Sequence, residues 1–138
     1  MKTTFLIFLT TFLFSNCSNQ NKVLTCNDFK SGTFENINQN ENKKFVIKRE
    51  NGKQVESAYD LKTNKIIVKD KTINISWIND CEYIITLDTA KTKGNQMELY
   101  INSKGGLKNK ILKIENNCAT VETTFEDKKM ITKFCKIK

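Results

Sequence analysis

The sequence predicts an all-β domain in which an antiparallel meander curls into a barrel or half-barrel. Apolar and polar side chains alternate with period two along most of the chain, and Ile, Val, Thr, Phe and Tyr are frequent in these stretches. Turn signals such as Asn51-Gly52 and Asn116-Asn117 separate them, and these connections are too short for the crossovers of a parallel sheet. About ten short strands would curl so that few edges stay exposed.

Residues 1–16 resemble an export signal. Lys2 precedes an apolar run over residues 5–14, which as a helix is only about 15 Å long and too short to span a bilayer. Cys17 follows at the distance seen in bacterial lipoproteins. Residues 13–17 resemble a lipobox, although Phe14 and Asn16 depart from its usual pattern. The alternative is an ordinary secretory signal cut near Ser15, which leaves Cys17 as a free thiol.

We therefore expect three parts: a lipoprotein signal peptide over residues 1–16, a lipid-anchored polar tether over 17–25, and a single β domain over 26–138. Acyl chains on Cys17 would hold the protein on a membrane durably. No acidic residue lies between Ser18 and Lys22. This favours the outer membrane with the domain facing the periplasm, and surface display is the alternative.

The expected strands follow the alternating pattern in order. They are 33–37, 44–50, 53–60, 65–69, 72–78, 81–87, 96–102, 107–115, 118–125 and 128–136. Residues 107–115 also fit a helix, but the glycine pair before them and their short length favour a strand. Asn51-Gly52 suits a type I′ turn, because both residues tolerate positive φ.

Burial selects the register of the hairpin around residues 78–80. A three-residue loop places Trp77 opposite Cys81 and Ile75 opposite Tyr83, so that these residues share one apolar face. A two-residue loop would mix apolar and polar residues on both faces. The sequence therefore predicts the three-residue loop.

Five cysteines in a short chain indicate an oxidising compartment. If one carries lipid, four remain, and four allow three pairings. A turn over residues 126–127 would place Cys118 directly opposite Cys135, at a site without backbone hydrogen bonds. We predict this disulfide, and Cys26–Cys81 by elimination. The alternatives are reduced cysteines or a metal site, and the lack of C-x-x-C spacing makes a metal site the less favoured.

Composition excludes several classes of function. The chain has no histidine, which excludes Ser-His-Asp triads, Cys-His dyads and imidazole metal sites. Its formal net charge is +8, and Arg49 is its one arginine. The scattered lysines indicate solvated strand faces. The alternative is a surface that rests against anionic lipid or polysaccharide. Nucleic-acid binding is not expected, because clustered basic residues with stacking aromatics are missing.

Two stretches resemble small uncharacterised lipoproteins of Bacteroidota-type bacteria. Residues 26–34 match C-x-x-F-K-x-G-x-F, and residues 75–83 match I-x-W-x-x-D-C-x-Y, with an I-x-R element at 47–49 between them. The resemblance covers roughly residues 26–100 and implies no established activity. The Phe-Lys-x-Gly-x-Phe segment with a later Trp is also similar to lipocalin-like barrels, by analogy of fold alone.

Arg49, Gln54 and Glu56 form the candidate site. Across the Asn51-Gly52 turn Arg49 opposes Gln54, and Glu56 lies diagonal to it. A guanidinium can bind a carboxylate or phosphate with two parallel hydrogen bonds, so one hypothesis is that Arg49 binds an anionic ligand head. The alternative is an internal Arg49–Glu56 pair that closes one barrel end.

From these features we expect a lipid-anchored, non-enzymatic protein of the cell envelope that binds a small amphiphile or anionic ligand. No cofactor or metal is expected. The alternative is a protein–protein interaction module, such as a periplasmic inhibitor or an envelope assembly accessory. Internal volume distinguishes the two, because an apolar cavity of several hundred cubic ångströms favours a carrier, and a filled core with an exposed apolar patch favours a protein partner.

Overall fold

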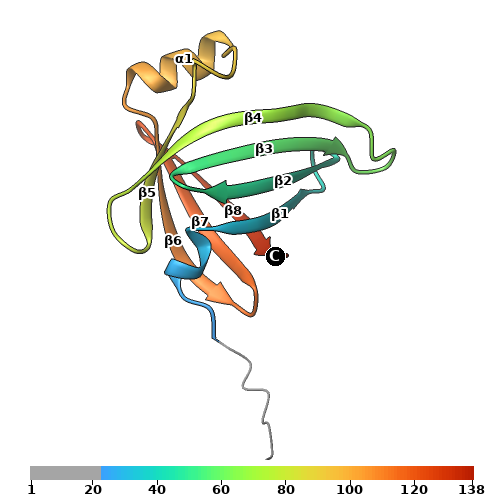
Figure 1. Cartoon of the computed structure of the whole chain (residues 1–138), viewed down its shortest axis with the longest axis vertical. Helices are drawn as coiled ribbons and strands as arrows, with labels where there is room; N and C mark the ends of the chain where they lie inside the picture. The colour runs from blue at the N-terminus through green and yellow to red at the C-terminus, as the bar shows by residue number, and fades with distance from the viewer. Residues whose placement is uncertain (1–22) are drawn as a thin grey trace, which may run out of the picture.

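The computed structural model describes residues 23–138 and shows a closed barrel of eight antiparallel strands in meander order (Figure 1). The predicted fold class is confirmed. β1 pairs with β8, which closes the barrel. The strands are β1 Gly32–Asn38, β2 Lys43–Glu50, β3 Lys53–Asp60, β4 Ile66–Trp77, β5 Glu82–Leu87, β6 Leu107–Glu115, β7 Cys118–Phe125 and β8 Lys128–Lys136. The predicted signal peptide and Cys17 lie outside the described residues.

Hairpin turns follow the sequence signals. Asn51 has φ 50° and Gly52 has φ 70°, as a type I′ turn requires. Glu50 therefore pairs with Lys53, and the predicted opposition of Arg49 and Gln54 follows. Residues 107–115 form a strand, as predicted.

Three of the ten expected strands differ from the structure, which has eight. The segments 65–69 and 72–78 form one long strand, β4, because Asp70 adopts φ 50° and absorbs the irregularity as a bulge within the ladder. The segment 96–102 is the helix α1, Gln96–Ser103. Asn95 and Glu98 form a capping box that starts this helix. The capping box favours the helix more strongly than the alternating sequence favours a strand.

The predicted register between β4 and β5 is shifted by two residues. Trp77 pairs with Tyr83 and Ile75 with Ile85. The chain reverses one residue later than expected, because the amide groups of Cys81 and Glu82 both donate to Asn79 Oδ1. The same side chains still face inward, since a shift of two preserves the face of a strand.

One end of the barrel is closed. The 3-10 helix η1, Cys26–Phe29, enters that end, and Phe29 is fully buried there. Its ring packs 5.5 Å from Phe34 and 5.8 Å from Phe134, measured between centroids. α1 lies at the opposite end (Figure 1).

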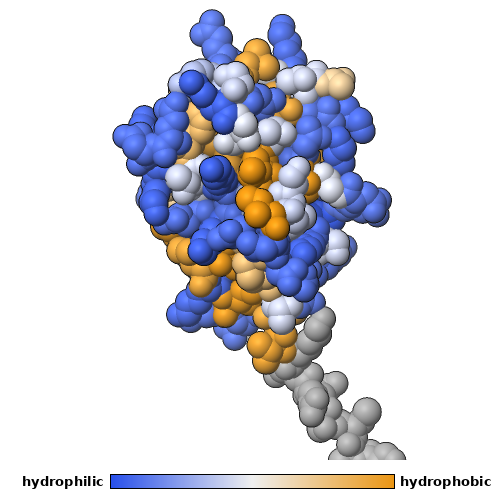
Figure 2. Space-filling model, turned by 90° about the vertical axis from the view of Figure 1, so that its left-hand side faces the viewer, coloured by the Kyte–Doolittle hydropathy of each residue, from blue (hydrophilic) through white to orange (hydrophobic). Residues whose placement is uncertain are grey.

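Hydrophilic residues cover most of the face that Figure 2 shows. Apolar residues gather at its lower edge, near the point where the described chain begins. Val23 is 85% exposed there. Within residues 23–138, no helix combines the length and apolar character needed to cross a bilayer.

Candidate functional site

The barrel encloses a cavity of about 420 Å³. It reaches the end that carries α1, since Glu98 and Ile101 of that helix contribute to its lining. The other contributors include inward-facing residues of β2 to β8. Apolar side chains make most of the wall, among them Ile47, Ile73, Ile85, Leu87, Val121 and Phe134. This volume lies within the range of about 300–1,000 Å³ that is typical of small-molecule sites.

Arg49 forms the floor of the cavity, at the closed end of the barrel, and is only 3% exposed. Its Nε donates to Gln54 Oε1 at 2.6 Å. One terminal nitrogen donates to the Phe29 carbonyl at 3.0 Å, and the other donates to the Tyr83 hydroxyl at 2.8 Å. The guanidinium thus ties η1 to β2, β3 and β5.

Aromatic rings surround the same guanidinium. Its Cζ lies 4.7 Å from the ring centroid of Tyr83, 4.8 Å from that of Phe134 and 5.3 Å from that of Phe34. Cation–π attraction is strongest where water is excluded, as it is here. Tyr83 and Phe34 are both buried in the core, and Tyr83 also lines the cavity.

No direct Arg49–Glu56 ion pair forms, contrary to the structural alternative considered from the sequence. Gln54 lies between them: its Oε1 accepts from Arg49, and its Nε2 donates to Glu56 Oε1 at 2.5 Å. The structure therefore brings the three predicted residues together on one face, in a chain of hydrogen bonds. All three line the cavity.

Glu56 is enclosed by protein but keeps part of its surface open to the cavity. Burial raises the pKa of this carboxyl, and the hydrogen bond from Gln54 and the charges of Lys71 and Arg49 only partly oppose that effect. Lys71 on β4 lies directly opposite Glu56 on β3 in the strand register. Its ammonium, however, forms its ion pair with Glu98 of α1.

Glu98 connects α1 to the barrel. One carboxylate oxygen accepts from the Asn95 amide at the start of the helix, and the other pairs with Lys71. The pKa of Glu98 is lowered chiefly by the Lys71 hydrogen bond. No residue of α1 is buried, so this ion pair is a principal contact of the helix at the cavity.

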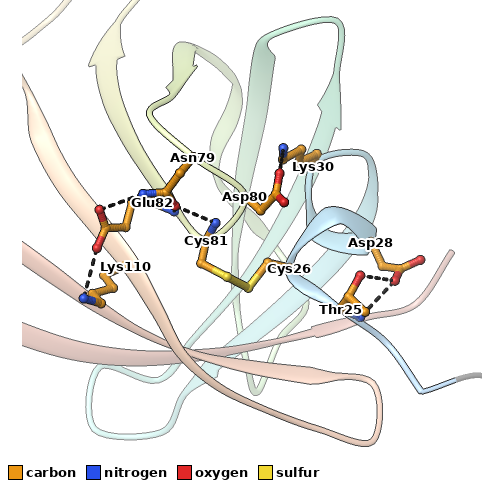
Figure 3. Close-up of a disulfide and its surroundings, with 9 residues drawn as sticks. All are labelled: Thr25, Cys26, Asp28, Lys30, Asn79, Asp80, Cys81, Glu82 and Lys110. Carbon is orange, nitrogen blue, oxygen red and sulfur yellow. Dashed lines mark hydrogen bonds and ion pairs between the residues drawn. A yellow bond between two sulfur atoms is a disulfide. The ribbon is translucent and has the colours of Figure 1, made fainter.

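Both predicted disulfides are confirmed. Cys26–Cys81 joins η1 to the loop before β5, and the Lys30–Asp80 ion pair lies beside it (Figure 3). Cys118–Cys135 joins directly opposed residues of β7 and β8. The first bond fixes the closed end of the barrel around the Arg49 floor.

Sequence reasoning missed Lys71, Glu98 and Asn109 as cavity residues. Asn109 is buried and accepts a hydrogen bond from the Thr123 hydroxyl at 2.7 Å. The Asn-x-x-Glu spacing of the capping box was the one local signal for Glu98. Residues 23–138 contain no cluster of three or more His, Cys, Asp or Glu side chains placed to hold a metal ion.

Comparison with protein-family models, curated proteins and solved structures found no match to this chain. The chemistry of the cavity is therefore the basis for a functional proposal.

Proposed function

We propose that this protein is a non-enzymatic binding protein that holds a small amphiphile inside its barrel. The observation that carries the proposal is the 420 Å³ cavity with mainly apolar walls and a few polar groups. Such a combination is typical of ligand sites, where apolar walls give affinity and sparse polar groups fix orientation. A barrel that served only as a scaffold would be expected to fill this space with side chains.

The polar groups of the cavity favour binding over catalysis. Arg49 already donates to three internal partners and is caged by aromatic rings. Lys71 and Glu98 are engaged with each other. A general acid–base mechanism needs a titratable pair within reach of one reacting atom. The titratable groups near Glu56 already have other partners, since Lys71 and Glu98 pair with each other and the Tyr83 hydroxyl accepts from Arg49.

A cavity-filling variant tests the proposal. Thr132 faces the cavity from β8, and Thr132→Phe would occupy part of the volume. The matched control is Thr120→Phe on β7, where the flanking Ala119 and Val121 point inward and Thr120 therefore points outward. The probe is N-phenyl-1-naphthylamine, a neutral amphiphile that fluoresces in apolar sites.

We expect wild type and Thr120→Phe to bind the probe with similar affinity and Thr132→Phe to bind it at least tenfold more weakly. Circular dichroism should show that both variants stay folded. Equal binding by all three proteins would place the probe on the outer surface and refute the proposal.

We further propose that the chain is a lipoprotein of the cell envelope, anchored through Cys17 to the outer membrane. The apolar run and Cys17 in sequence support this, as do two disulfides, which form in oxidising compartments. Intact-mass measurement of the membrane-extracted protein tests it. A mass without acyl groups, or Cys17→Ser protein that still partitions with membranes, would contradict it.

A protein–protein module is the second candidate, and one observation favours it. Ile66, Ile67 and Val68 are 57%, 50% and 39% exposed on the part of β4 that pairs only with β3. An exposed apolar strand edge is a site where another chain can add. If Thr132→Phe has no effect on probe binding while Ile67→Lys abolishes it, this candidate replaces the carrier.

A further inference from the structure

Some charged groups of the cavity wall form ion pairs and others do not. Five groups face Glu56: Arg49 from β2, Lys71 from β4, Tyr83 from β5, Glu98 from α1, and Gln54 on its own strand. Among these, Lys71 and Glu98 neutralise each other as an ion pair. Arg49 is hydrogen-bonded to neutral acceptors, so its charge is not cancelled by direct contact.

Glu56 makes no ion pair in the part of the chain that the structure describes. Its carboxyl accepts from the neutral Gln54 amide, and burial is the main influence on its protonation. Desolvation disfavours the charged form of such a group. When Glu56 is protonated, two cations and one carboxylate remain around it, so this group of side chains carries an excess positive charge. Glu41 also lines the cavity, and its carboxylate is paired with Lys43.

We propose that the cavity takes amphiphiles with an anionic oxygen head, such as a carboxylate, sulfonate or phosphate, and that Glu56 takes up one proton from solvent when they bind. This inference rests on the proposed carrier function and names its ligand class. The protonated carboxyl donates a hydrogen bond to the head, and Arg49, which is hydrogen-bonded to neutral acceptors, supplies the attracting charge. The tail lies against the apolar wall that includes Ile73 and Ile85. The overall charge of +8 draws anions toward the protein.

The coupling has a defined sign. A bound anion stabilises the protonated form of Glu56, so binding raises the pKa of this carboxyl above its ligand-free value. Affinity is then greatest at low pH and falls as the pH rises through that range. The expected change is about tenfold or more, the effect of one unit charge at close range in a partly buried site.

Two matched probes separate charge from cavity access. The dye 1-anilinonaphthalene-8-sulfonate carries a sulfonate that stays ionised between pH 5 and pH 8, and N-phenyl-1-naphthylamine is its neutral counterpart. Fluorescence titrations of both are made across this range. The variant is Glu56→Gln, which keeps an acceptor for Gln54 and mimics the protonated acid. The control is Glu122→Gln on β7, whose carboxylate pairs with Lys129 outside the cavity.

We expect the anionic dye to bind wild type and Glu122→Gln more tightly as the pH falls. Glu56→Gln should bind it tightly at every pH. The neutral dye should show no slope with any protein. Calorimetry in two buffers of different ionisation enthalpy should give net proton uptake for wild type and none for Glu56→Gln.

Each contrary result has a separate meaning. An unchanged slope in Glu56→Gln, or an equal slope for the neutral dye, overturns the inference. Weaker binding of the anionic dye by Glu56→Gln also overturns it, and points to a cationic head instead. If the neutral dye does not bind wild type at all, the proposed carrier function fails first.

Discussion

Replacing Arg49 by methionine tests whether its guanidinium holds the closed end of the barrel together. Methionine keeps an unbranched stem but donates no hydrogen bond. The Phe29 carbonyl and Gln54 Oε1 lose the bonds that they accept, and a stranded buried acceptor costs about 1–3 kcal/mol. Part of this is offset, because a buried charge no longer has to be desolvated. We expect the free energy of unfolding to fall by about 3 kcal/mol.

The assay is urea denaturation followed by the fluorescence of Trp77, the one tryptophan. Its ring lies 4.6 Å from that of Tyr83, so its emission reports on the closed end. Lys48→Met on the same strand is the control, because Lys48 is exposed, and such changes usually stay within about 0.5 kcal/mol. A loss below about 1 kcal/mol for Arg49→Met would refute the structural role.

Three further changes should alter stability in defined ways. The Cys26–Cys81 disulfide closes a loop of 55 residues and the Cys118–Cys135 disulfide one of 17, so removing the first should lower the free energy of unfolding by about 1 kcal/mol more than removing the second. Each disulfide is removed by a double Cys→Ser change, and a larger loss of thermal stability for the Cys118–Cys135 variant would contradict this. Burial raises the pKa of Glu56, so ionising it destabilises the folded wild type, whereas Glu56→Gln cannot ionise. The free energy of unfolding of Glu56→Gln should therefore exceed that of wild type by an amount that is absent in acid, grows as the pH rises above 4.5 and levels off above the raised pKa. A difference that does not change with pH in urea titrations would refute this. Gly106→Ala should destabilise more than Gly105→Ala, because both have positive φ but only at Gly106 would a Cβ meet the backbone of β5; equal urea midpoints would contradict that reasoning.

Local patterns predicted most of the barrel, because strands and tight turns are decided by neighbours in sequence. Asn51-Gly52 required positive φ and thereby fixed the pairing of Arg49 with Gln54. The failures arose where a local pattern was ambiguous. Residues 96–102 alternate like a strand, yet the capping box at Asn95 makes them helical.

The cavity could be predicted only in part, because its wall is assembled from distant segments. Arg49, Gln54 and Glu56 come from one hairpin, so their proximity followed from the turn. Lys71 and Glu98 meet only because β4 and α1 lie together at the open end. The volume itself depends on the closure of β1 on β8, which no local pattern reports.

A methyl NMR measurement on the full mature protein with bound N-phenyl-1-naphthylamine tests most directly whether the ligand lies inside the barrel. Ile47, Ile73 and Ile85 line the cavity, and Ile66 and Ile67 are exposed on β4. We expect intermolecular nuclear Overhauser effects from the probe to the three isoleucines of the cavity wall and none to the two exposed isoleucines of β4. Contacts confined to Ile66 and Ile67 would contradict it.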